Sequence, residues 1–403
     1  MNPVVADLWD QIEILLQAAE FRQVIDLCRS ALTDARRKSN THAEIMALIG
    51  WSAAHKYIGA FGEARILVDG AVKKAEQADS PQLLALALNT SGSIHLVCSL
   101  RAEDAEQDYR AALDIAYDVD DHVGVATALA GIGASLLSVG DASRAKRFAL
   151  EAFDTARDID DKYLMAGALS LIGSAMLEGT DEEATLKAFQ DALNLVREHG
   201  LRLLEGTIVG NIGLALLKSS RYYEDGISML ERSLEMAEKI SCVPHEYSAL
   251  HRLGTAYQQL GRFKEAQDYY DTVLTRTQTW GARAYEGAAF FTLGLLAYAD
   301  KRTDAALADL HQAAGINREM MNPYREAMTD MWLGMIYADK RDFSNALKHY
   351  NNARTIYDSL DDDTRVRQMT QIVVWVHILK LWDGLLRFVG IRSKDDEDEN
   401  KAA

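Results

Sequence analysis

Three residues near the middle of the chain, Cys242, His245 and His251, belong to types that bind transition metals. Thiolate and imidazole ligands hold zinc when their spacing lets several side chains point at one ion. His245 and His251 are six residues apart, which places them on different faces of a helix. The spacing argues against a shared ion, so the sequence predicts no metal and no cofactor.

Neighbouring carboxylates, which could serve acid/base chemistry, recur at Asp120–Asp121 and Asp160–Asp161. Because the pairs are 40 residues apart, we interpret them as turn and N-cap residues that face a helix dipole. Gly131 and Gly133 lack the third glycine and the preceding strand that a dinucleotide site requires. No phosphate loop, zinc-protease motif or nucleophile elbow occurs. We therefore predict no catalytic residue and expect that the chain is not an enzyme.

A pattern that repeats every 40 or 41 residues organises the chain from its beginning to about Asp363. In each copy a small side chain lies near the start of the second of two helices, and six of the nine are Ala. The positions are Val24, Ala64, Ala105, Ala145, Thr185, Gly226, Ala266, Ala306 and Ala346. The first helices carry Gly or Ser at their eighth helical slot, at Ser52, Ser93, Gly133, Gly173, Gly213, Gly254, Gly294 and Gly334. Gly costs a helix about 1 kcal/mol relative to Ala, so its recurrence indicates that two helices cross closely there.

The copy at 253–270 resembles the tetratricopeptide repeat at seven positions. They are Leu253, Gly254, Tyr257, Gly261, Phe263, Ala266 and Tyr270. The resemblance covers about nine tenths of the chain and implies an all-α, right-handed superhelical solenoid of about nine helix-turn-helix repeats. The usual repeat has about 34 residues. The longer copies here resemble a subclass found in adaptor and scaffold proteins and in bacterial regulators that sense peptides. The match is weakest in the first, fifth and sixth copies.

The copies follow one another without a linker rich in Pro, Gly or Ser, so we expect one solenoid over residues 1–363. Residues 364–391 are expected to form a C-terminal amphipathic helix that caps the solenoid or interacts with a partner. An acidic, disordered tail is expected at 392–403.

The formal net charge is −17, with 60 acidic and 43 basic residues. Such a chain repels phosphate backbones and anionic lipids on average, so we expect no nucleic-acid partner. The N-terminal residues lack the basic start and apolar run of a secretory signal. Cys28, Cys98 and Cys242 show no disulfide spacing, which favours a reducing, cytoplasmic location.

In the resembled family, the first helices line a concave face, and six signature positions point into it. Early and middle copies place mostly small or apolar residues there: Thr90, Ser91, Ile94, Ala130, Ala134, Ser170 and Ser174. Copies six and seven are polar, with Asn211, Lys218, His251, Arg252, Thr255, Gln258 and Gln259. The last two copies add apolar groups, Phe291, Tyr298, Met328, Met331, Trp332 and Met335. We predict that the polar set, together with Met331, Trp332 and Met335, binds a peptide or protein partner.

Asn211 and Arg252 also occupy two slots that the carboxylate-clamp members of the family use to hold a C-terminal carboxylate. The other clamp slots hold Ser170, Ser174 and Ser248, which depart from the clamp pattern. An ordinary solvated concave face remains the alternative interpretation.

The segment from Ile372 to Val389 predicts a helix with an unusually broad apolar arc that includes Trp375, Trp382, Leu386 and Phe388. A membrane span is disfavoured because Lys380, Asp383 and Arg387 would each cost about 2 to 3 kcal/mol near the bilayer centre. Three roles stay open: a cap on the last repeat, self-association or binding of a partner helix, and interfacial membrane contact.

Two functions follow. The first is a non-catalytic scaffold or adaptor that binds peptide segments or helices of partner proteins in its concave groove. The alternative is a peptide- or ligand-sensing regulator in which ligand tightens the superhelix and changes partner binding. Regulators of that kind usually carry an effector module, and the repeats here begin within about ten residues of the first Met. The sequence therefore favours the scaffold.

Overall fold

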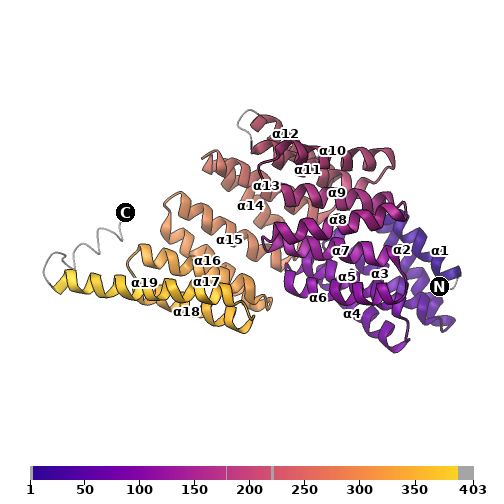
Figure 1. Ribbon diagram of the computed structural model, residues 1–403, viewed down its shortest axis with the longest axis horizontal. Coiled ribbons are helices and arrows are strands. Elements are labelled where there is room, and N and C mark those ends of the chain that lie inside the picture. The colour runs from indigo at the N-terminus through magenta and orange to yellow at the C-terminus, as the bar shows by residue number, and fades with distance from the viewer. Residues whose placement is uncertain (1–2, 178, 219–221, 389–403) are drawn as a thin grey trace. The chain divides into compact units, whose positions relative to one another are not determined.

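Paired helices account for nearly all of residues 3–177, 179–218 and 222–388, which are the residues that this computed structural model describes. Within these ranges there are nineteen helices and no strand (Figure 1). The first helices of the nine hairpins are α1 (Pro3–Gln17), α3 (Thr41–Ile58), α5 (Pro81–Cys98), α7 (His122–Ser138), α9 (Lys162–Met176), α11 (Arg202–Leu217), α13 (Val243–Gln259), α15 (Arg283–Ala299) and α17 (Pro323–Asp339). The second helices are α2 (Phe21–Arg37), α4 (Phe61–Gln77), α6 (Ala102–Asp118), α8 (Ala142–Asp158), α10 (Glu182–Glu198), α12 (Tyr223–Lys239), α14 (Phe263–Trp280), α16 (Thr303–Glu319) and α18 (Phe343–Ser359). The prediction of nine hairpins is confirmed.

The recurrent small residues lie where the two helices of a hairpin cross. Each of the nine small positions is the fourth residue of its second helix, and all nine are buried. A Cβ atom added to Gly213 would lie 2.9 Å from the carbonyl oxygen of Gly226. In the second hairpin, the Ser52 hydroxyl donates to the carbonyl oxygen of Ala64 over 2.6 Å. The crossing is therefore close enough that backbone carbonyls contact the opposite helix directly.

The acidic turns act as caps, as their recurrence predicts. Asp120 and Asp160 have φ of +57° and +58°, the left-handed conformation that ends the preceding helix. Asp121 and Asp161 then accept hydrogen bonds from the backbone amides of Gly124 and Leu164, each over 3.0 Å. These bonds satisfy first-turn amides that have no partner within the helix.

The chain packs as two compact units. Among the described residues, unit 1 comprises those up to residue 262 and residues 276–282, and unit 2 comprises residues 263–275 and 283–388. The division falls inside α14, where the sequence shows no linker. Each unit has a hydrophobic core of its own. The expectation of one unbroken solenoid over residues 1–363 stays a prediction.

Within unit 1, the beginning of the repeat array meets its later copies. Helix α1 contacts α11, and α3 contacts α13. The rings of Tyr57 and His245 lie 6.4 Å apart, and Gly59 packs against the side chain of Val243. One apolar core contains residues from both places, among them Met46 and Cys242. The first helices of unit 1 therefore surround a cavity that is partly open to solvent.

The last helix, α19 (Asp363–Phe388), caps the ninth repeat in unit 2. Met369, Val373 and Val376 are buried in the same apolar core as residues of α17 and α18. Asp383 is also buried, and its carboxylate accepts from Arg341 Nη1 over 2.9 Å. Seven apolar side chains of α19 are exposed instead: Val374, Trp375, Ile378, Leu379, Leu381, Trp382 and Leu385.

By length and composition alone, α19 could cross a membrane, and it is the one such helix among the described residues. The same test is passed by core helices of other proteins, so it carries little weight by itself. The predicted acidic tail at 392–403 and the end of the predicted helix at 389–391 lie outside the described residues.

Candidate functional site

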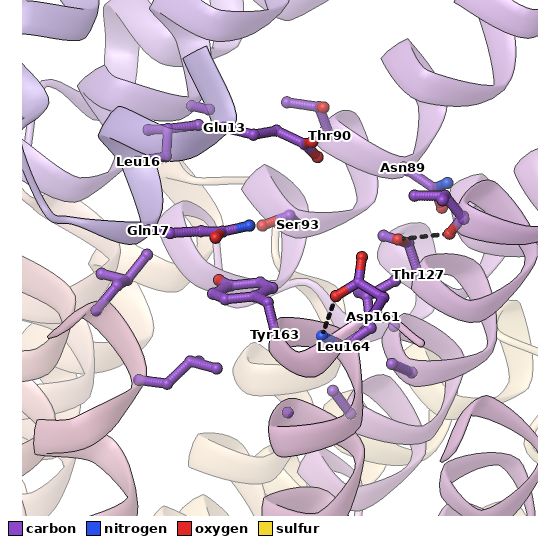
Figure 2. Close-up of a pocket in the computed structure, with 18 of the residues that line it drawn as sticks. Glu13, Leu16, Gln17, Asn89, Thr90, Ser93, Thr127, Asp161, Tyr163 and Leu164 are labelled. Carbon is purple, nitrogen blue, oxygen red and sulfur yellow. Dashed lines mark hydrogen bonds between the residues drawn. The ribbon is translucent and has the colours of Figure 1, made fainter. Parts of the chain in front are cut away.

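A cavity of about 820 Å³ lies inside unit 1, bounded by α1, α3, α5, α7, α9, α11 and α13. A volume of this size is typical of sites that bind small ligands. Figure 2 shows Glu13 and Gln17 of α1 facing Thr90 and Ser93 of α5, with Asp161 and Tyr163 of α9 beside them. Most of the lining comes from the first helices of seven successive repeats, and Tyr109 of α6 adds to it.

One end of the cavity is acidic. Glu13, Asp121 and Asp161 line it, and Asp10 lies beside Glu13 on α1. Burial, followed by the charge of Asp161 and smaller contributions from Asp10 and Asp121, raises the pKa of Glu13 to about 7. A carboxyl group in such surroundings is stabilised in its protonated form until a cation comes close.

Two buried asparagines line the cavity with unpartnered carbonyl oxygens. Asn89 and Asn211 are each 4% exposed, and no hydrogen bond reaches the Oδ1 atom of either residue. Their amide nitrogens are engaged: Asn89 donates to the carbonyl oxygen of Gly124 over 3.2 Å. Asn211 donates to Ser170 Oγ over 3.1 Å and to Ser174 Oγ over 3.3 Å. Because buried polar atoms are rarely left without a partner, both oxygens are positioned to accept a hydrogen bond from a ligand or a water molecule.

A second group of cavity residues is basic. Lys56 is buried, donates to Ser93 Oγ over 2.6 Å, and lies 4.3 Å from the centre of the Tyr57 ring. Burial lowers the pKa of Lys56 to about 8 and that of Arg252 to about 10. Both pKa values lie above 7, so both side chains are predominantly cationic at neutral pH.

Burial, together with the charges of Lys56 and Arg252, lowers the pKa of His245 to about 4. The imidazole is therefore neutral, and its Nδ1 atom has no hydrogen-bond partner among the described residues. The cavity consequently has an acidic group near the start of α7 and α9 and a basic group on α3 and α13.

The structure brings only part of the predicted partner-binding set to the cavity. Asn211 and Arg252 line it, as do five of the small concave residues, Thr90, Ala130, Ala134, Ser170 and Ser174. Five others belong to unit 1 but are not among the lining residues: Lys218, His251, Thr255, Gln258 and Gln259. Their role in binding stays a prediction.

The apolar part of the predicted set lies in unit 2. Met331 and Met335 are half-buried against the core that α19 covers, and Trp332 packs on a neighbouring core. In α19, Trp375 is 65% exposed and Trp382 is 59% exposed, whereas Leu386 is half-buried. Phe388 is the last residue of α19, and its side chain lies outside the described residues.

The sequence interpretation missed the acidic end and Asn89. Asp121 and Asp161 are helix caps, as the sequence predicts, but a cap carboxylate can also line a cavity when the helix starts at its edge. Glu13 lies in the first copy, where the repeat match is weakest. A mid-helix Asn at residue 89 was a usable signal, because Asn is unfavourable in helix interiors unless its amide has a partner.

The sequence and the fold are similar to those of known proteins. The sequence profile of the tetratricopeptide repeat matches residues 247–279. The chain folds as tetratricopeptide repeats. Tetratricopeptide repeat protein 29 of Trypanosoma brucei brucei (strain 927/4 GUTat10.1) is 26% identical over 148 residues, which is 36% of this chain and 31% of that protein. The chain thus matches less than a third of that relative's length.

Solved structures with the same repeats cover much more of the chain. NprR in complex with its cognate peptide NprX has a TM-score of 0.62 at 14% identity, covering 90% of this chain and 99% of that one. A Rap protein complexed with Competence and Sporulation Factor has a TM-score of 0.60 at 13% identity, covering 94% and 98%. The apo form of the quorum sensor NprR from B. thuringiensis has a TM-score of 0.51 at 12% identity, covering 87% and 98%. At these identities the likeness concerns the fold.

Proposed function

We propose that the protein is a non-catalytic, peptide-binding regulator whose ligand occupies the cavity of unit 1. The observation that carries the proposal is a cavity in which the buried Oδ1 atoms of Asn89 and Asn211 lack partners. A peptide backbone offers amide donors to such oxygens at regular intervals. A cavity of about 820 Å³ suits a ligand of drug-like size, comparable to a peptide of about five residues.

The arrangement of charge also suits a peptide with free ends. A free peptide is cationic at one end and anionic at the other, and the cavity presents carboxylates in one region and Lys56 and Arg252 in another. Arg252 forms no hydrogen bond or ion pair with any described residue, although its charge is desolvated. A ligand carboxylate would supply that missing partner.

Contacts between early and late helices of unit 1 favour the regulator over the open-groove scaffold that the sequence favoured. Because α1 contacts α11 and α3 contacts α13, less space is left along this face for a helix of a partner protein. A ligand that touches α1 and α13 together stabilises the closed arrangement in proportion to its affinity. Among the solved structures of this fold, NprR was obtained with its cognate peptide NprX.

Native mass spectrometry with a mixture of random pentapeptides tests the proposal. We expect the wild-type protein to retain a subset of peptides at a ratio of one per chain. Replacing Asn89 and Asn211 by Leu, a residue of similar shape without amide groups, should abolish retention. The control is Asn194→Leu on α10, whose amide group is exposed and distant from the cavity lining. If no peptide is retained by the wild type, the cavity does not bind peptides.

A scaffold role remains the second candidate, and the exposed apolar face of α19 supports it. We propose that this face contacts the same face of a second copy of the chain. An apolar face is complementary to itself, and a copy of the chain is present wherever the protein is. An anionic membrane is a less favourable occupant because the net charge is −17. Three buried, unpaired cysteines support the further proposal of a cytoplasmic location.

A further inference from the structure

The acidic end of the cavity contains hydrogen-bond acceptors and carboxylates without a matching cation. Glu13, Asp121 and Asp161 reach it from α1, α7 and α9. None of these three carboxylates forms an ion pair with any residue in the described part of the chain. The charges that act on Glu13 are those of Asp161, Asp10 and Asp121, all of the same sign. Gathering like charges in a half-buried space is unfavourable unless something positive enters it.

An independent observation points to the same place. The amide of Asn89 is bonded to the carbonyl oxygen of Gly124, and the backbone amide of Gly124 is bonded to Asp121. Asn89 therefore lies beside the Asp121 cap, and its unpartnered Oδ1 atom belongs to the acidic end. This side chain is 4% exposed, so bulk water does not satisfy that oxygen. Figure 2 shows Asn89, Asp161 and Glu13 around the same cavity, on three different helices.

The arrangement of the acceptor groups favours an organic cation over a metal ion. Within the described ranges, no three His, Cys, Asp or Glu side chains are close enough to hold one metal ion. Hard cations need several oxygens at about 2.0 to 2.6 Å. Ammonium and guanidinium groups instead carry three and five N–H donors that point in different directions, so they can bridge acceptors that are further apart.

We infer that the acidic end of the cavity is a subsite for an organic cation, an ammonium or guanidinium group, on the ligand. The group is either the N-terminal ammonium of a peptide or a basic side chain within it. This inference rests on the proposed peptide-binding function, which it makes more specific.

The experiment uses the full chain and three mixtures of pentapeptides built from the same uncharged residues. All three keep a free C-terminal carboxylate. The first mixture is N-acetylated and has no cationic group, the second is N-acetylated with one Lys or Arg, and the third has a free N-terminus and no basic residue. Retention by the protein is measured by native mass spectrometry. We expect the second or the third mixture to be retained about tenfold more than the first, because hydrogen bonds to charged groups are stronger than neutral ones. Which of the two is retained identifies the source of the cation.

Substitutions at the helix caps remove charge while preserving the fold. Asp121→Asn and Asp161→Asn delete a carboxylate, and Asn remains a good N-cap residue. Glu13→Gln does the same on α1. Each variant should lower the preference for cationic peptides several-fold while circular dichroism shows unchanged helicity. The matched control is Asp141→Asn, which alters the cap of α8 outside the cavity lining and should change nothing.

The outcomes separate the inference from the function on which it rests. Equal retention of all three mixtures by the wild type would overturn the cation subsite while leaving peptide binding intact. A preference that survives in Glu13→Gln and in both cap variants would also overturn it, because the carboxylates would then be irrelevant. If no mixture is retained at all, peptide binding itself is wrong, and the subsite fails with it.

Discussion

The protonation state of a single carboxyl group in the cavity, that of Glu13, affects the stability of the folded protein. Its pKa is raised to about 7 by burial and by the neighbouring carboxylates, whereas an unfolded chain would restore an ordinary value near 4.5. Between these two values the folded protein holds a proton that the unfolded chain releases. Stability therefore falls as the pH rises through this window, because the folded state binds more protons than the unfolded state.

Replacing Glu13 by Gln should remove this pH dependence. We expect the variant to match the wild type near pH 4.5 and to be more stable at pH 8 by about 1 to 3 kcal/mol, the value of a shift of this size. Urea unfolding followed by circular dichroism at both pH values measures the difference. Glu231→Gln on the exposed side of α12 serves as the control. A variant that differs from the wild type equally at both pH values would contradict this account of Glu13.

Within one hairpin, the fold depends on how closely the two helices approach. Gly213 and Gly226 cross with backbone in contact, and a Cβ atom on Gly213 would lie 2.9 Å from the carbonyl oxygen of Gly226. Gly70 in α4 is also helical, but nothing lies within 4 Å of the position that its Cβ atom would take. The same substitution should therefore have opposite effects at the two sites.

Gly213→Ala should destabilise the protein by about 1 to 3 kcal/mol, because the hairpin must open to admit the methyl group. Gly70→Ala should stabilise it by about 0.5 to 1 kcal/mol, because Ala loses less backbone entropy in a helix. Thermal unfolding of the two variants beside the wild type measures both. A stabilising Gly213→Ala would show that the crossing is looser than described.

Helix α19 packs on the ninth repeat through both apolar and polar side chains, and it presents further apolar residues to solvent. Asp383 and Lys380 bond to Arg341 and Ser344 of that repeat, while Trp375 and Trp382 are exposed. Full burial of a large apolar side chain contributes about 1.5 to 3 kcal/mol. Burial of the exposed apolar face in an interface would therefore strongly favour association.

Replacing Trp375 and Trp382 by Glu should convert an associated protein to a monomer, with helicity preserved because neither side chain contributes to the core. Light scattering coupled to size-exclusion chromatography measures the molar mass. The control is Gln371→Glu on an exposed position of the same helix. A wild type that is monomeric at all concentrations would leave α19 with the capping role alone. Binding of the wild type to neutral vesicles would favour the membrane alternative.

Across the whole molecule, the two units should respond differently to ligand. The cavity belongs to unit 1, where α1 contacts α11 and α3 contacts α13. Occupation should therefore hold these four helices together, while nothing in the proposal links the ligand to the core under α19.

Hydrogen exchange measured by mass spectrometry tests this with any retained pentapeptide. We expect slower exchange in α1, α3, α11 and α13 when the peptide is bound, and unchanged exchange in α17 and α18. Arg252→Gln should reduce the protection, whereas Arg232→Gln on the exposed side of α12 should not. Protection confined to unit 2 would place the ligand site there instead.

The amino-acid sequence determined the local architecture of this protein. Its 40-residue period predicts nine hairpins, because each small residue marks a close crossing between neighbours in sequence, and the Asp pairs mark helix starts. Those interactions span few residues, so the pattern that encodes them recurs and is readable. The slot positions also placed Asn211 and Arg252 on the inner face.

Only the tertiary structure decided where the cavity is and what it contains. Each hairpin is rotated slightly relative to the preceding one, and the contact between the first and sixth repeats depends on the total rotation. No local residue pattern encodes this total. That contact brings Glu13 of α1 to Asp161 at the start of α9, and it desolvates Lys56 and Arg252 in the same cavity. Burial and charge at the cavity therefore arise from residues about 150 to 200 positions apart in sequence, which local periodicity cannot relate.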